Sequence, residues 1–227
     1  MRKYVCFSLG LALPALAVFF TGCLTQTTYE TANLLKKNHV DITPGYSGYY
    51  LHASGPDAPD VNSNWKNSYG VSLGYGVTDG FNVYGYYEYS DYPQFARFGE
   101  EAGLHFFQLE PKFELERARN SVSFPIGYTE YAGIKVLQFG ARSFTNFYWS
   151  RKSFYCLSVS GMANVGFEDR DDFAGALVVN NVFNAALPQR FYIRPQIGVD
   201  VSALLFSAAA GFQLASINVG IGLGREF

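Results

Sequence analysis

Apolar residues alternate with small or polar residues along most of this chain. In residues 69–77 every odd position is tyrosine, valine or leucine, whereas every even position is glycine or serine. The alternation resumes in residues 81–89, after a turn signal at residues 78–80. Because successive side chains of a β-strand point to opposite faces of its sheet, this period of two predicts a hairpin of two strands.

Similar segments follow along the rest of the chain. Residues 104–116 alternate phenylalanine and leucine with glutamine, glutamate and lysine, and residues 120–121 are expected to form a turn. In the next segment Pro125 removes one ladder hydrogen bond. Short alternating segments are individually weak signals, so the strand count is roughly eight to ten, with ten the best estimate. The further candidate strands are residues 39–54, 122–129, 144–150, 154–167, 177–187, 191–201 and 207–227.

The composition suggests where the two faces of these strands point. Hydrophobic residues make up 48% of the chain and charged residues only 16%, and the second face consists largely of glycine, serine and asparagine. The exterior of a water-soluble protein would carry more lysine and glutamate. We therefore expect the small and polar face to line a lumen and the apolar face to contact lipid.

Aromatic residues gather near the ends of two segments. They are typical of the girdles that flank the apolar band of a membrane barrel, and the alternative is ordinary packing in a core. The residues concerned are Tyr84, Tyr86, Tyr87, Tyr89 and Tyr92 in one segment, and Phe144, Phe147, Tyr148 and Trp149 in the other.

Beyond residue 22 the chain has no apolar run of about 18 residues, which a membrane-spanning helix would need. Strands that face lipid must close into a ring, because unpaired backbone groups in hydrocarbon cost several kcal/mol each. We therefore predict an all-β fold, a single closed antiparallel up-and-down transmembrane β-barrel over residues 39–227. A ring of roughly ten strands is narrow, and side chains largely fill it.

Residues 1–22 are predicted to be a signal peptide. Arg2 and Lys3 precede an uncharged apolar stretch, which is the pattern of exported proteins. The stretch ends in Phe-Thr-Gly-Cys23, which resembles the lipobox of bacterial lipoproteins. That resemblance implies that Cys23 is acylated, whereas cleavage near residues 15–17 would leave it a free thiol. Residues 23–38 are polar and lack alternation, and we expect them to form an N-terminal tether.

The last residue extends the comparison with exported barrels. Phe227 ends an alternating strand and resembles the C-terminal signal of outer-membrane barrel proteins, although Arg225 stands where an apolar residue is usual. Together with the leader and the alternation, the chain resembles small outer-membrane β-barrel proteins of double-membraned bacteria. The resemblance implies an outer-membrane location, with outer-membrane lipid and the barrel-assembly machinery as partners.

Several function classes are disfavoured by what the chain lacks. The net charge is −2 and no lysine or arginine cluster occurs, so we expect no nucleic-acid partner. Cys156 is the one cysteine downstream of Cys23, and no intrachain disulfide is expected. The three histidines form neither a nucleophile–base arrangement nor a metal-ligand spacing. We predict no catalytic activity, no cofactor and no metal site.

Six charged residues are predicted to point into the lumen. Since buried charges in a narrow barrel must pair, we expect a salt-bridged plug, and a small polar passage is the alternative. The residues are Glu88, Glu110, Lys112, Glu114, Arg194 and Asp200.

The favoured function is a structural or surface-binding barrel without catalysis, which displays residues 54–66, 90–103 and 167–173 as loops to an unidentified ligand. The first alternative is a small channel for polar or hydrophobic solutes. The second is a lipid-tethered, soluble, lipocalin-like binding barrel. An outer-membrane hydrolase or acyltransferase is least favoured, because no nucleophile and base are paired in the sequence.

Overall fold

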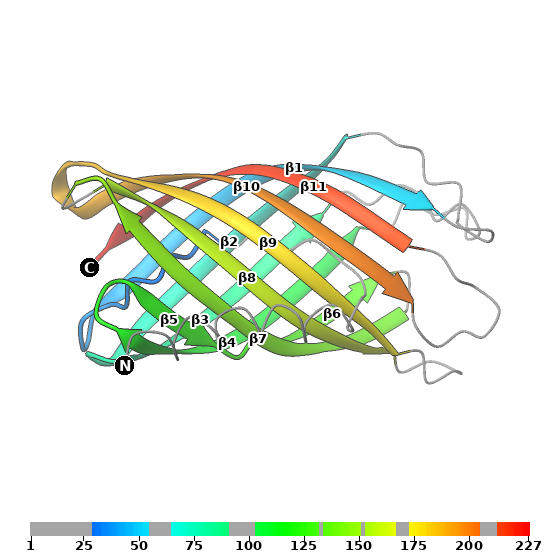
Figure 1. The fold of residues 1–227 in the computed structure, drawn as a ribbon, viewed down its shortest axis with the longest axis horizontal. Coiled ribbons are helices and arrows are strands. Elements are labelled where there is room, and N and C mark those ends of the chain that lie inside the picture. The colour runs from blue at the N-terminus through cyan, green and yellow to red at the C-terminus, as the bar shows by residue number, and fades with distance from the viewer. Residues whose placement is uncertain are drawn as a thin grey trace, which may run out of the picture.

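A closed barrel of antiparallel strands makes up most of the computed structural model, which describes residues 29–54, 65–90, 103–131, 134–150, 153–166, 173–204 and 213–227 (Figure 1). One short 3-10 turn, η1 (Pro188–Arg190), joins two of the strands. The strands are β1 (Val40–Ser54), β2 (Trp65–Thr78), β3 (Phe81–Ser90), β4 (Leu104–Glu116), β5 (Asn120–Ser123), β6 (Ile126–Tyr131), β7 (Ile134–Tyr148), β8 (Ser153–Gly166), β9 (Phe173–Ala186), β10 (Phe191–Leu204) and β11 (Gln213–Glu226).

Strand pairing follows the order of the chain. Strands β5 and β6 together occupy one position between β4 and β7, and β1 pairs with β11 to close the ring. The predicted closed antiparallel barrel with ten strand positions is therefore confirmed. At the seam, the backbones of Val40 and Phe227 exchange hydrogen bonds of 2.8 and 3.2 Å. Among the described residues, no helix is long and apolar enough to cross a membrane.

Pro125 separates β5 from β6 without changing the register. The Phe124 amide still donates to the Pro111 carbonyl at 3.0 Å, and the Gly140 amide donates to the Pro125 carbonyl at 3.1 Å. The nitrogens of Pro111 and Pro125 cannot donate, so the hydrogen-bond ladder has fewer bonds at this point but is not interrupted.

Two sequence predictions in this part of the chain were wrong in position. The turn lies at residues 117–119, where Ala118 has a positive φ of 58°, and not at residues 120–121, which begin β5. Strand β7 begins at Ile134 and not at Phe144. Its first part was missed because small outward residues such as Ala141 and Ser143 weaken the apolar alternation.

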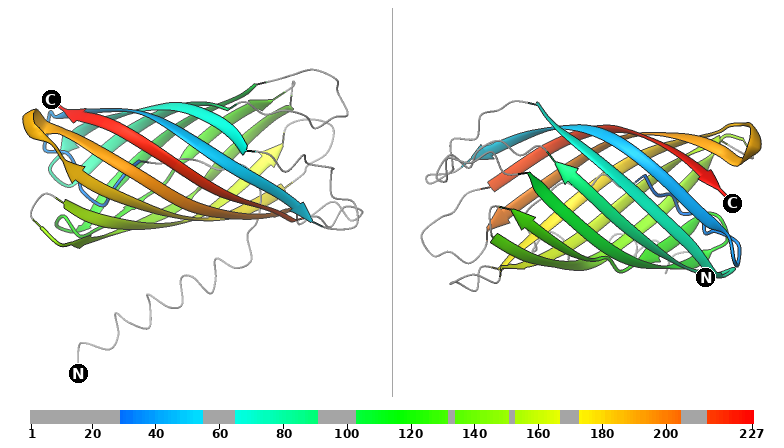
Figure 2. Two further views of the ribbon diagram at one scale, coloured as in Figure 1. Left: turned by 90° about the horizontal axis from the view of Figure 1, so that it is seen from above. Right: turned by 180° about the vertical axis from the view of Figure 1, so that it is seen from behind.

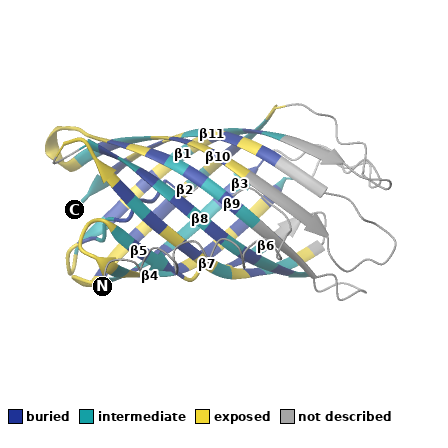
Figure 3. Cartoon of the chain, viewed as in Figure 1, coloured by how far each residue is buried: buried dark blue, intermediate teal, exposed yellow. Residues whose placement is uncertain are grey.

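The barrel has an apolar outside and a polar inside, and along the described parts of the strands buried residues alternate with exposed or half-exposed ones (Figure 3). Leu73 and Leu109 are more than half exposed, whereas the neighbouring inward residues Ser72 and Glu110 are buried. This is the reverse of a water-soluble protein. The apolar belt includes Ile42, Val71, Leu73, Phe107, Leu109, Ile126, Phe139, Phe183, Ile197, Val199, Ile217, Val219, Ile221 and Leu223.

Some of the aromatic residues predicted for the girdles point inward instead. Tyr84 and Phe144 are 3% and 1% exposed. Tyr84 packs against the inward Gly74, and Phe144 packs in a buried cluster that includes Cys156. Phe147 and Trp149 are 51% and 61% exposed on the outer surface, as a girdle requires. Tyr92 lies outside the described residues.

The two ends of the barrel differ. At one end, which we call the turn end, short connections such as residues 79–80 and 117–119 join the strands, and β11 ends at Glu226, next to the C-terminal Phe227 (Figure 2). At the opposite end, the loop end, the connections fall mostly outside the described residues. The predicted display loops at residues 54–66, 90–103 and 167–173 lie largely outside the described residues, and the strand ends that flank them are at this end.

Most of the described part of the expected tether lies inside the barrel, and its residues 36–38 are exposed at the turn end. Residues 29–38, the N-terminal segment, enter from the turn end, and Tyr29 and Ala32 are 5% and 0% exposed. The segment was predicted to be a tether because its sequence is polar and lacks strand alternation. The same polarity suits it to the polar lumen in which it lies. Cys23 and the predicted signal peptide lie outside the described residues, and both remain predictions.

Candidate functional site: the occupied lumen

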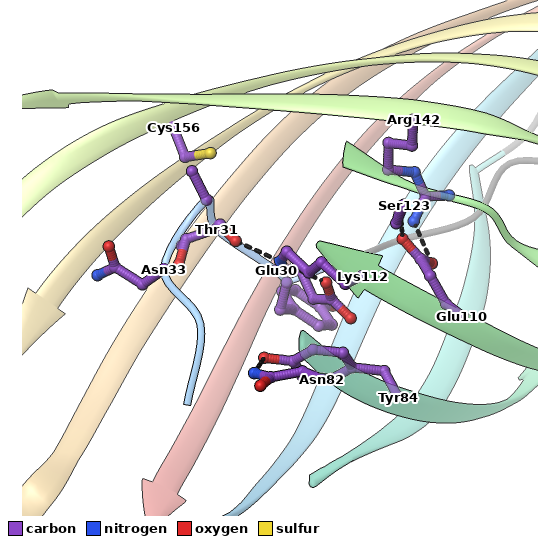
Figure 4. A network of polar contacts seen from close by, with 12 residues as sticks. Glu30, Thr31, Asn33, Asn82, Tyr84, Glu110, Lys112, Ser123, Arg142 and Cys156 are labelled. Atoms are coloured by element: carbon purple, nitrogen blue, oxygen red, sulfur yellow. Dashed lines mark hydrogen bonds and ion pairs between the residues drawn. The ribbon is translucent and has the colours of Figure 1, made fainter. Parts of the chain in front are cut away.

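A fully buried ion pair joins two strands across the wall of the lumen. Arg142 on β7 places Nη1 2.8 Å from Oε2 of Glu110 on β4, and both side chains are at most 1% exposed (Figure 4). The Arg142 Nε donates to Ser160 at 2.7 Å. Glu110 also accepts hydrogen bonds from Gln108 and Ser123. The low dielectric of the interior makes such a satisfied network rigid.

Lys112 points into the lumen from β4, the strand that carries Glu110, and binds the N-terminal segment. Its ammonium lies 2.7 Å from Oε2 of Glu30 and also donates to the carbonyl of Thr31 (Figure 4). The same nitrogen lies 4.0 Å from the centre of the Phe144 ring and 5.2 Å from that of Tyr84. A buried lysine needs such partners, because an unpaired charge in the interior is strongly unfavourable.

Arg194 on β10 is a second cation that holds the segment. Its Nη1 donates to the Tyr29 carbonyl at 2.9 Å, and its Nε donates to Asn184 at 2.9 Å. The guanidinium stacks 3.8 Å from the centre of the Tyr192 ring and lies 3.8 Å from the Asp41 carboxylate. Arg194 therefore ties the segment to the first strand and to the tenth.

Asn146 on β7 binds the segment from another side of the lumen. Its Oδ1 accepts a hydrogen bond of 3.0 Å from the Ala32 amide, and its Nδ2 donates to Asn33 at 2.9 Å. Ala32 itself packs in a buried cluster with Phe144, Phe154, Cys156 and Val182. The wall thus binds both the main-chain amide and the methyl group of Ala32.

Three inward glycines form a hollow for the ring of Tyr29. Gly45 on β1 lies beside Gly222 on β11, and Gly220 lies one inward position further along β11. A Cβ atom at any of the three would overlap Tyr29. The phenol at the bottom of this hollow donates to the Tyr46 carbonyl at 2.8 Å. These three glycines are needed because the ring approaches the backbone closely.

The wall formed by β9, β10 and β11 carries amides. Gln196 donates from Nε2 to Asn180 at 3.1 Å and to Asn218 at 3.2 Å. The remaining oxygen of Gln196 is buried without a protein partner, as is the hydroxyl of Ser216. Buried polar atoms of this kind are usually satisfied by ordered water.

The N-terminal segment divides the space inside the barrel. On the turn-end side, a vestibule of about 1500 Å³ is lined by residues that include Thr31, Leu35, Arg117, Tyr148 and Arg194. On the other side of Tyr29, a space of only about 10 Å³ is left among Tyr29, Ser72, Tyr86, Glu88 and Gln108. Among the described residues, the lumen is therefore open from the turn end as far as the segment, and only this small space is left beside Tyr29 on its other side.

The six predicted lumen charges do not form one network. Lys112 and Arg194 contact the segment, and Glu110 pairs with Arg142 in the wall. Glu88 is buried nearer the loop end, where Ser68 donates to it, and Glu114 is partly exposed at the turn end, where it accepts from the Ala118 amide at 2.9 Å. The side chain of Asp200 lies outside the described residues.

Sequence reasoning missed three charged partners. Arg142 was missed because β7 has a weak alternation, although Gln138, Arg142 and Asn146 share its inward face. Glu30 was missed because its segment was interpreted as a tether, and Asp41 because it stands at a strand end. Within the described ranges, no three His, Cys, Asp or Glu side chains converge as metal ligands would.

No protein-family model and no curated protein sequence matches the chain. Among solved structures, an outer membrane channel from Pseudomonas putida F1 is similar, with a TM-score of 0.53 and 11% identity over 90% of this chain and 100% of that chain. The attachment invasion locus protein of Yersinia pestis aligns with a TM-score of 0.33 and 15% identity over 83% and 99% of the two chains. The N-terminal barrel domain of Pseudomonas aeruginosa OprF aligns with a TM-score of 0.29 and 13% identity over 84% and 99%. The first likeness shows that the fold is that of the outer-membrane β-barrels.

Proposed function

We propose that this protein is a bacterial outer-membrane barrel whose lumen is closed by its own N-terminal segment, and that its role is structural or surface-binding and not catalytic. The observation that carries the proposal is the burial of residues 29–32 across the lumen, with Glu30 paired to the fully buried Lys112. A barrel closed in this way offers its outer ends, and not its interior, to other molecules.

The apolar belt supports a membrane location. Large aliphatic and aromatic side chains on the outside would be costly in water, and each contributes roughly 1.5–3 kcal/mol when it is removed from water. In outer-membrane barrels, short turns face the periplasm and long loops face outward. By this rule the turn end is the periplasmic end. We further propose acylation at Cys23, an assembly signal at Phe227, and outer-membrane lipid and the barrel-assembly machinery as partners.

A small channel is the second candidate, and the vestibule favours it. A cavity of about 1500 Å³ leads from the turn end to a segment that the chain holds covalently at one end. Withdrawal of such a segment would open the way towards the loop end. The similar structure from Pseudomonas putida F1 is described as an outer membrane channel, which is compatible with this candidate. The lipocalin-like alternative is disfavoured, because a soluble barrel would not expose the apolar belt.

Fractionation of a Cys23→Ser variant tests membrane embedding without a lipid anchor. We expect the variant to stay in the outer-membrane fraction after a carbonate wash, and to migrate faster on a gel before boiling than after it. The unaltered protein serves as the matched control. Release of the variant into the soluble periplasmic fraction would overturn the proposal and favour the tethered soluble barrel.

A further inference from the structure

The N-terminal segment is held as a ligand is held, and not as a strand of the barrel. Its residues 29–33 add no strand to the sheet. Wall side chains instead bind its main chain: Arg194 the Tyr29 carbonyl, Lys112 the Thr31 carbonyl, and Asn146 the Ala32 amide. Main-chain hydrogen bonds supply much of the affinity when proteins bind extended peptides.

Two side-chain positions add selectivity to this recognition. The glycine hollow fits a flat ring, and the Tyr46 carbonyl at its end accepts a phenol hydrogen bond. Lys112 is 0% exposed and pairs with the carboxylate of Glu30 at 2.7 Å, so this position selects for a negative charge. The site therefore fits an aromatic residue followed immediately by an acidic one.

We propose that the lumen wall is a binding site for an extended peptide in which an aromatic residue precedes an acidic residue, and that residues 29–33 are its tethered occupant. A free peptide of this kind would enter through the turn-end vestibule and take the place of the segment. The tether gives the resident segment an effective concentration on the order of millimolar, so an unaltered segment competes strongly with free peptide. This proposal concerns the interior site and does not require that the barrel conducts.

Cys156 provides a native reporter for the occupancy of the site. Its thiol is 0% exposed and packs in the same buried cluster as Ala32 (Figure 4). When the segment leaves, the thiol becomes reachable from the vestibule. The experiment uses the full chain with Cys6→Ser and Cys23→Ser, which leaves Cys156 as the only thiol, and measures the rate at which a small maleimide labels it.

We expect Glu30→Gln to raise this labelling rate at least tenfold, because the resident loses its ion pair with Lys112. The peptide acetyl-Tyr-Glu-Thr-Ala-Asn-amide, at millimolar concentration, should lower the labelling rate of the Glu30→Gln variant at least fivefold. A matched peptide with alanine for tyrosine and glutamine for glutamate should leave it unchanged. The difference in migration between boiled and unboiled protein shows in each case that the barrel is folded.

Equal protection by both peptides, or by neither, would overturn the proposal of a selective peptide site. Tyr29→Ala supplies a second route, since it empties the glycine hollow and leaves Lys112 in place. If neither Glu30→Gln nor Tyr29→Ala speeds the labelling of folded protein, the segment does not exchange and the proposal fails. Both failures leave the membrane proposal standing, because retention of the Cys23→Ser variant in the outer-membrane fraction tests that separately.

Discussion

Replacement of Arg142 by alanine is expected to destabilise the barrel by about 3–5 kcal/mol, the usual cost of removing one partner of a buried ion pair. Glu110 would keep its hydrogen bonds from Gln108 and Ser123 but would lose its ion pair with Arg142. The measurement is the free energy of unfolding in urea, with the folded barrel in detergent or lipid vesicles.

The matched control is Arg119→Ala. Arg119 pairs with Glu116 at 3.7 Å, and both side chains are more than half exposed at the turn end. Exposed pairs contribute about 0–1 kcal/mol, so this variant should unfold nearly as the unaltered protein does. The double variant Arg142→Met with Glu110→Gln should recover much of the lost stability, because no buried charge is left unpaired. Equal effects of Arg142→Ala and Arg119→Ala would contradict a structural role for the pair.

Reversal of the charge at Glu30 is expected to open the barrel. In Glu30→Lys, two cations would face each other where Lys112 now lies 2.7 Å from a carboxylate, so the segment should leave the lumen. Loss of about 3 kcal/mol of binding would increase the open population about 100-fold. Conductance across planar bilayers measures this directly: the unaltered protein should show rare or no steps, and Glu30→Lys should show frequent ones.

Lys37→Glu is the control for this experiment. It changes a charge by the same amount in the same segment, but Lys37 is exposed at the turn end and only its backbone amide is bound, to Asp79 at 3.1 Å. Its conductance should match that of the unaltered protein. If Glu30→Lys folds and stays as closed as Lys37→Glu, then the segment does not close the lumen by means of this pair.

The barrel itself follows from local properties of the sequence. The alternation around Val71 and Leu73 fixes which face of a strand is apolar, and the short turns at one end require antiparallel pairing of the strands that they join. Closure follows because open edges are not tolerated in lipid. The inward positions of Glu110 and Lys112 follow from the same period of two.

The occupant of the lumen could not be predicted in this way. The contacts of Tyr29 with Gly45 and of Glu30 with Lys112 join positions far apart in the sequence, and no local pattern records them. The glycines at 220 and 222 leave space on the inner face of β11, but the sequence does not indicate which ring fills that space. The inward position of Arg142 could have been predicted from the sequence, because residues 138 and 146 on the same face are also polar and point inward.

The most direct test of the account is a disulfide between the segment and the wall. Ala32 and Cys156 belong to one buried cluster, so Ala32→Cys places two thiols together only if the segment lies in the lumen. In folded protein that also carries Cys6→Ser and Cys23→Ser, we predict a disulfide under mild oxidation, loss of maleimide labelling at both positions, and a lumen that stays closed when Glu30→Lys is added. Free labelling of both thiols in the folded barrel, with no disulfide formed, would contradict a lumen occupied by residues 29–35.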